Sequence, residues 1–95
     1  MLVVGNAARL ASLQIGLERE DEYQNFRVEI RTAQGQEVWT QDNLRPRQSR
    51  AGRFVNLVIP GSVFNIGEYE LTLKGVIDNQ KSEDVRYYYF GVLNK

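Results

Sequence analysis

The chain has 95 residues, 42% of them hydrophobic and 25% charged, a composition typical of one folded globular domain. Twelve basic residues balance twelve acidic residues, so no net field draws the protein to nucleic acid or to a membrane surface. Because Cys and His are both absent, disulfides, thiol nucleophiles, the usual zinc ligands and the commonest acid–base side chain are excluded. We therefore expect a single domain over residues 1–95, ordered over about residues 10–93, with no metal or other cofactor.

Alternation of apolar and polar residues predicts two strands in the first third of the chain. The first covers Leu10–Leu17 and the second Tyr23–Thr32, with a charged turn at residues 18–22 between them. In the second strand, apolar side chains occupy one face and charged side chains the other: Phe26, Val28 and Ile30 against Arg27, Glu29 and Arg31. Ala33–Gln36 then predicts a tight hairpin turn in which Gly35 takes a positive φ.

The middle of the chain is less regular. Glu37–Thr40 is predicted to be the returning strand, with Trp39, the only tryptophan, in the core. Asp42–Gly52 is polar, contains Pro46 and shows no periodicity, which predicts a long loop. Arg53–Ile59 resumes the alternation and predicts another strand.

The last third carries the clearest strand signal. Ser62–Ile66 is expected to form a single 3₁₀ turn before a central strand over Gly67–Val76. Asp78–Ser82 predicts a hairpin loop, and Glu83–Leu93 a final strand. Within the central strand, Tyr69 is expected to be buried, with its hydroxyl bonded to backbone near Val63 as in a tyrosine corner. No window favours a helix longer than one turn, and no run approaches the roughly 20 apolar residues of a membrane span.

About seven short strands separated by turns predict an all-β fold, an antiparallel β-sandwich, with a small closed barrel as the alternative. The predicted core is made of the inward-facing residues of these strands. These residues are Leu13, Ile15, Phe26, Val28, Ile30, Leu57, Ile59, Tyr69, Leu71, Leu73, Tyr88, Phe90 and Val92.

Several motifs resemble immunoglobulin-like and fibronectin type III-like bacterial modules. The motifs are Pro60-Gly61, then Gly67-Glu68-Tyr69-Glu70-Leu71-Thr72-Leu73, and finally Tyr88-Tyr89-Phe90-Gly91-Val92. With Phe26–Thr32 and Gly35–Trp39 added, the chain resembles the C-terminal domains of membrane-anchored bacterial proteins of the anti-sigma-factor type, over about Leu10–Val92. The zinc finger and membrane helix of those proteins are absent from this sequence. The resemblance implies an immunoglobulin-like sandwich on the extracytoplasmic side of a membrane. A cytoplasmic location is the alternative.

Two groups of charged residues suggest ion binding. Four arginines within one loop can bind phosphate or carboxylate through paired hydrogen bonds: Arg45, Arg47, Arg50 and Arg53. A solvated loop is the favoured alternative. Four acids in the first turn offer oxygen ligands for Ca²⁺, namely Glu18, Glu20, Asp21 and Glu22, but without a spaced calcium-loop motif a charged turn is favoured. Glu68 and Glu70 share the solvent face of one strand, so a glycosidase pair is disfavoured.

The final strand is where a binding function is expected. If Tyr88 and Phe90 face the core, Tyr87 and Tyr89 face outward and can stack on a sugar or a protein. A terminal strand often lies at a sheet edge, where its unpaired backbone groups can bind a strand from another chain. We therefore expect a non-catalytic interaction or spacer module of a larger bacterial protein, with a protein partner and no nucleic acid. A carbohydrate-binding module using the same two tyrosines is the alternative, and the oligomeric state is left open.

Overall fold

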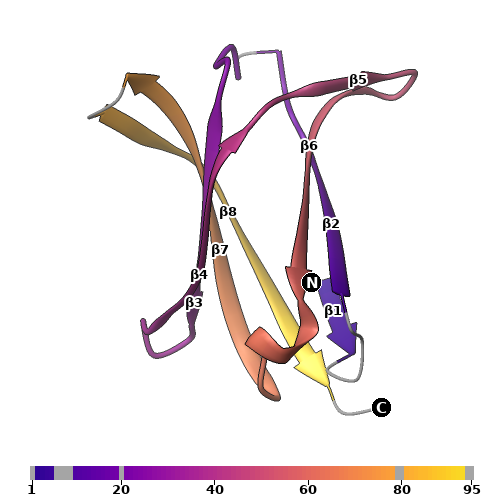
Figure 1. Ribbon diagram of the computed structural model, residues 1–95, viewed down its shortest axis with the longest axis vertical. Helices are drawn as coiled ribbons and strands as arrows, with labels where there is room; N and C mark the ends of the chain where they lie inside the picture. The colour runs from indigo at the N-terminus through magenta and orange to yellow at the C-terminus, as the bar shows by residue number, and fades with distance from the viewer. Residues whose placement is uncertain (1, 6–9, 20, 79–80, 94–95) are drawn as a thin grey trace.

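The computed structural model describes residues 2–5, 10–19, 21–78 and 81–93, which form two stacked β-sheets (Figure 1). One sheet has five strands in the order β1-β8-β7-β3-β4, and the other has three in the order β2-β6-β5. The elements are β1 (Leu2–Gly5), β2 (Leu10–Gly16), β3 (Phe26–Thr32), β4 (Glu37–Leu44), β5 (Arg47–Ser49), β6 (Gly52–Pro60), the 3₁₀ turn η1 (Gly61–Val63), β7 (Gly67–Asp78) and β8 (Lys81–Leu93). The prediction of an all-β sandwich is therefore confirmed.

The order of the strands identifies the kind of sandwich. In the lettering used for immunoglobulin domains, β2 is strand B, β3 is C, β4 is C′, and β5 to β8 are D to G. One sheet then contains strands B, E and D, and the other contains G, F, C and C′. This is the arrangement of an immunoglobulin domain, with β1 added beside strand G. Leu71 lies two residues after Tyr69, where antibody domains carry the second cysteine of their inter-sheet disulfide. Here its buried side chain, 2% exposed, fills the same part of the core with apolar contact.

Several boundaries differ from the sequence-based prediction. The predicted loop Asp42–Gly52 contains the end of β4 and the whole of β5, which pairs with β6. All three residues of β5 are exposed, so the segment has no apolar alternation to reveal it. The strand β1 was not predicted; it pairs in parallel with the end of β8, from Leu2 opposite Phe90 to Gly5 opposite Leu93.

The strand β3 begins at Phe26 and not at Tyr23 as predicted. The reason lies in the packing of the Tyr23 ring, which covers the backbone of β7 at Gly75. A methyl group added to Gly75 would lie 2.5 Å from that ring. Tyr23 also makes an edge-to-face contact with Phe26, at 5.6 Å between ring centroids. Its aromatic ring therefore closes one end of the core from a loop and does not extend the sheet.

The core contains all the predicted residues except Tyr88, which is half-buried. Leu44, Val55 and Phe64 are also buried and were not in the predicted set. Trp39 is half-buried, because β4 is the last strand of its sheet and lies opposite β3 on one side only. The alternation predicted for the other strands was correct because each has the sandwich interior on one face.

A tyrosine corner joins the start of β7 to the turn before it. Tyr69 is 5% exposed, and its hydroxyl donates to the carbonyl oxygen of Asn65 at 2.8 Å. The backbone N–H of Asn65 donates back to the same hydroxyl at 2.9 Å. The predicted bond was to backbone near Val63; the partner lies two residues later, in the segment between the end of η1 at Val63 and the bend at Ile66. The hydroxyl thus satisfies both backbone groups of one residue.

Replacing Tyr69 with phenylalanine should lower the free energy of unfolding by about 1–3 kcal/mol, because both backbone groups of Asn65 lose their partner. Urea denaturation followed by Trp39 fluorescence measures this loss. The matched control is Tyr89→Phe, which removes a hydroxyl from an exposed ring and should leave stability unchanged. Equal stability of the two variants would show that the corner does not hold the turn.

Candidate functional site

Two tyrosine side chains of β8 project from the outer face of the five-stranded sheet. Tyr87 is 50% exposed and Tyr89 is 61% exposed, whereas Phe90 is buried. Across the strand pair they lie opposite Thr72 and Glu70 of β7. The outward direction predicted for both rings is confirmed, and two large aromatic surfaces lie side by side in solvent.

The Tyr87 ring is fixed by its hydroxyl. It donates a hydrogen bond to Asp84 Oδ2 at 2.6 Å, and Lys74 Nζ lies 3.0 Å from the other oxygen of the same carboxylate. These contacts lower the pKa of Asp84, first through the Tyr87 hydroxyl and then through Lys74. The bond to Asp84 raises the pKa of Tyr87. Since the hydroxyl is already engaged, a partner meets chiefly the apolar ring face.

Beside the tyrosines, the outer face of the sheet carries a compact ionic network centred on Glu29. Its carboxylate accepts from Arg27 Nε at 2.9 Å and from Arg31 Nη2 at 2.8 Å, and it is 8% exposed as a residue. Burial alone would raise the pKa of Glu29, but the Arg27 bond and the nearby cations lower it. Arg27 also pairs with Asp42. Opposite charges are matched here, so the exposed aromatic rings are the distinctive part of this face.

A groove lies between the two sheets on the side where β2 and β8 approach each other. Its volume is about 540 Å³, and Tyr87 and Tyr89 border it. Its floor is formed by the apolar side chains of Leu13, Ile15, Leu71, Tyr88 and Phe90. None of the described residues that line it is charged. Pockets of this size and apolar character are typical of binding sites.

The acidic turn contains an ion pair that the sequence analysis did not predict. Asp21 is 6% exposed, and its carboxylate pairs with the guanidinium of Arg86 and accepts from the backbone N–H of Glu18 at 2.8 Å. Arg53 Nη2 donates to the carbonyl oxygen of Asp21 at 3.0 Å. Burial would raise the pKa of Asp21, but the Glu18 and Arg86 bonds lower it. The acids of this turn were expected to form a charged turn, and within it Asp21 is buried because β8 supplies the Arg86 guanidinium as its partner.

Arg86 could have been recognised by its position. It occupies the inward-facing series of β8 together with Tyr88 and Phe90, and a charge in that series requires a buried partner. Of the other acids proposed as calcium ligands, Glu18 and Glu22 are exposed and Glu20 is outside the described residues. Among the described acidic residues, no cluster with the geometry of a metal site is formed.

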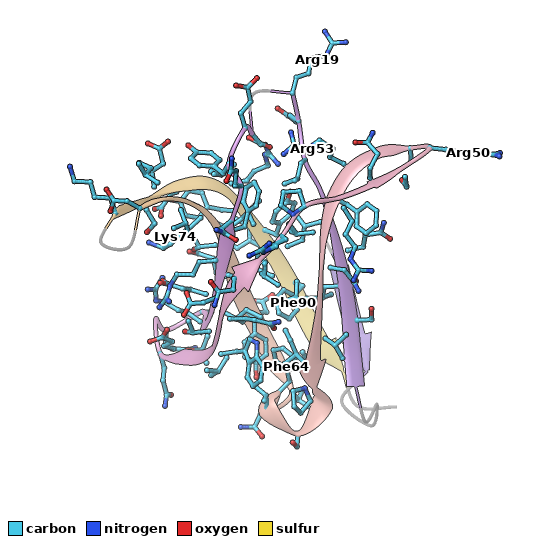
Figure 2. All side chains as sticks on the ribbon, turned by 45° about the horizontal axis from the view of Figure 1, so that its top comes forward. Arg19, Arg50, Arg53, Phe64, Lys74 and Phe90 are labelled. Atoms are coloured by element: carbon cyan, nitrogen blue, oxygen red, sulfur yellow. The ribbon has the colours of Figure 1, made fainter. Side chains whose placement is uncertain are left out.

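The four loop arginines are distributed over the β5–β6 hairpin and its approach. Arg50 extends from the tip, while Arg53 lies back toward the body of the domain beside Asp21 (Figure 2). Arg47 faces Phe54 across the hairpin and Arg53 faces Gln48, so these two arginines lie on opposite faces. Arg45 is exposed just after β4. Anion binding by this set stays a prediction, and phosphate titration followed by amide shifts at 45–53 tests it.

Comparisons with known proteins assign no family to this chain. No family model and no curated protein matches the chain. A solved structure similar to it is the immunoglobulin-like domain of mouse leukocyte-associated immunoglobulin-like receptor 1, described as a strand-swapped dimer. That domain is 12% identical with a TM-score of 0.46, and the match covers 98% of this chain and 88% of the mouse one.

The fold is immunoglobulin-like. Its strand order and its tyrosine corner establish this independently of any sequence match. Within the ranges that the structure describes, no helix is long and apolar enough to cross a membrane. The resemblance to anti-sigma-factor-type proteins stays a prediction.

Proposed function

We propose that this domain is a non-catalytic protein-binding module and that it contacts its partner through Tyr87 and Tyr89. The observation that carries the proposal is the pair of exposed rings on one strand, 50% and 61% exposed, on the same face as the ionic network of Glu29. Exposed aromatic side chains are enriched at protein interfaces because each removes a large rigid apolar surface from water on binding. Immunoglobulin-like domains are usually binding modules without catalytic activity.

In the same proposal, the domain belongs to a larger bacterial protein, membrane-anchored and regulatory, and lies on the extracytoplasmic side. The motif resemblance over Leu10–Val92 supports this placement. A fusion of alkaline phosphatase to the domain in its full parent chain tests it, because that enzyme becomes active outside the cytoplasm, where its disulfides form. An inactive, well-expressed fusion would contradict the placement.

Carbohydrate binding is the second candidate, and one feature of the surface favours it. A shallow cavity of about 240 Å³ lies beside Tyr89 and is bordered by Glu68 and Glu70. An aromatic ring next to carboxylates can stack on a sugar while the oxygens accept its hydroxyl hydrogens. A glycan array probed with the domain distinguishes the two: saturable glycan binding that is lost in Tyr89→Lys would favour the sugar.

The protein-binding proposal is tested with a random peptide library displayed on phage. We expect peptides enriched on the wild-type domain to bind at least about tenfold more weakly to Tyr87→Lys and Tyr89→Lys, because each change removes an aromatic contact. Ser62→Lys, an exposed position in η1, is the control and should bind normally. Enriched peptides that bind all three variants equally would contradict a role for the tyrosines.

A further inference from the structure

The outer edge of β8 is free of a partner strand over a short, defined stretch. The order of its sheet places β1 beside β8, but β1 pairs only with residues 90–93. At the other end, a register shift between Leu73 opposite Arg86 and Lys74 opposite Asp84 makes Val85 the extra residue of a β-bulge. Bulges on edge strands bend the strand and prevent pairing beyond them. Among the described residues, no strand pairs with the outer edge of residues 86–89.

The opposite wall of the groove is a second open edge. The strand β2 is the first in its sheet and pairs with β6, and within the described ranges no strand lies on its other side. In immunoglobulin constant domains a strand A lies at this edge, beside strand B. Figure 1 shows β2 running in the direction opposite to β8. One added strand parallel to β8 would thus be antiparallel to β2.

The open stretch of β8 is bounded at both ends. Arg86 Nη1 donates to the carbonyl oxygen of Gly16 at 3.3 Å, so its side chain spans from β8 to the end of β2. At the other end β1 already occupies the edge from Phe90 onward. Between these ends, no described residue pairs with the outer edge of residues 87–89, which corresponds to about 10 Å of extended chain. The apolar floor described above lies beneath this stretch.

The geometry points to a strand-acceptor site in this groove: an extended peptide segment of a protein partner adds along residues 87–89 of β8, in line with β1. The inference deepens the proposed binding function and rests on it, because it names the chemistry of the partner. Backbone N–H and C=O groups on the open edge would give affinity, and the floor would give selectivity. Pairing of β1 with the same edge shows that β8 accepts a parallel strand here.

The groove sets the chemistry of the segment. It must be extended and free of proline at the paired positions, because proline lacks the N–H that the edge requires. It must carry an apolar side chain at alternate positions, since successive side chains point to opposite faces and one face meets Leu13, Ile15 and Tyr88. It must be neutral over this stretch, because the described lining holds no charge to pair with one.

The probe is a capped, neutral tripeptide, valine-threonine-valine, which matches the length of the open stretch; it is titrated into the whole domain and followed by amide chemical shifts and hydrogen exchange. We expect saturable shifts at residues 12–15 and 87–89, with exchange of the edge amides slowed at least about tenfold. The same peptide with a central proline should bind about tenfold more weakly, because one backbone hydrogen bond is lost.

Different probes separate this inference from the proposed function, because Tyr87 and Tyr89 border the groove as well as the outer face and a change at either residue would alter both. The backbone edge is therefore tested with the tripeptide and its proline form on the wild-type domain, and the tyrosine rings are tested with the library peptides. Binding of library peptides by the tyrosines, with no tripeptide shifts at 12–15 and 87–89, would overturn the strand-acceptor site and leave the binding function standing. Equal binding of the proline peptide would also overturn it, because the backbone pairing would then play no part.

Discussion

Replacing Phe90 with alanine should lower the free energy of unfolding by about 3–5 kcal/mol. Phe90 is 2% exposed and stacks on Tyr69, with 5.5 Å between ring centroids and 17° between planes. It also meets Phe64 edge-on at 5.7 Å (Figure 2). Truncation removes the central ring of this cluster and leaves a cavity that two aromatic neighbours cannot close without moving. Because the free energy of unfolding of a small domain is only about 5–15 kcal/mol, much of the total stability would be lost.

Urea denaturation with Trp39 fluorescence measures the effect. Tyr89→Ala is the matched control: the neighbouring residue has a ring of similar size that is 61% exposed, and its loss should change stability by no more than roughly 0.5 kcal/mol. Phe90→Leu keeps most of the volume and should cost about 1–2 kcal/mol. If Phe90→Ala cost no more than Tyr89→Ala, the cluster of three aromatic rings would not be part of the stable core.

Replacing Arg86 with methionine should cost about 2–3 kcal/mol at neutral pH, because the carboxylate of Asp21 stays buried without its cation. The cost is below that of a fully buried pair, since the Arg86 side chain is 27% exposed and the Glu18 N–H still donates to Asp21. The Arg86 bonds to Tyr88 and Asp21 raise its own pKa, so it remains charged at every pH of interest. The titrating group is therefore Asp21.

The expected pH dependence has a defined direction. Folding lowers the pKa of Asp21, so its contribution is complete above the ordinary carboxyl pKa of about 4 and is lost as the pH falls through the folded-state value. The difference between wild type and Arg86→Met should therefore be largest near pH 7 and shrink below about pH 4. In an Asp21→Asn background, Arg86→Met should cost clearly less. A difference that is constant with pH would show that Arg86 acts through packing alone.

The strand β8 would thus serve two surfaces at once. Its outer face presents Tyr87 and Tyr89, which also border the groove, and its inner face and open edge form one wall of the groove. The two can be separated by experiment because the library peptides test the tyrosine rings and the proline-containing peptide tests the backbone edge. The ion pair between Arg86 and Asp21 would position both surfaces at their Arg86 end, since it holds β8 against the turn that follows β2.

The sequence by itself determined which face of most strands is buried. Alternation in Phe26–Thr32 and Gly67–Val76 placed the inward residues correctly, because a strand with one buried face must repeat every two residues. The same reasoning placed Tyr87 and Tyr89 in solvent and Tyr69 in a corner. These features depend on local periodicity and on one turn, both of which are contained in a short window.

Tertiary structure alone decided three other features, each of which depends on residues distant in sequence. The strand β5 is polar and exposed, and pairing with β6 is what makes it a strand. The strand β1 exists beside β8, at the opposite end of the chain. Asp21 is buried because Arg86, 65 residues later, supplies its counter-charge. The groove follows from the same cause: it lies between two strand edges, and which edges remain open is known only when every strand has been paired.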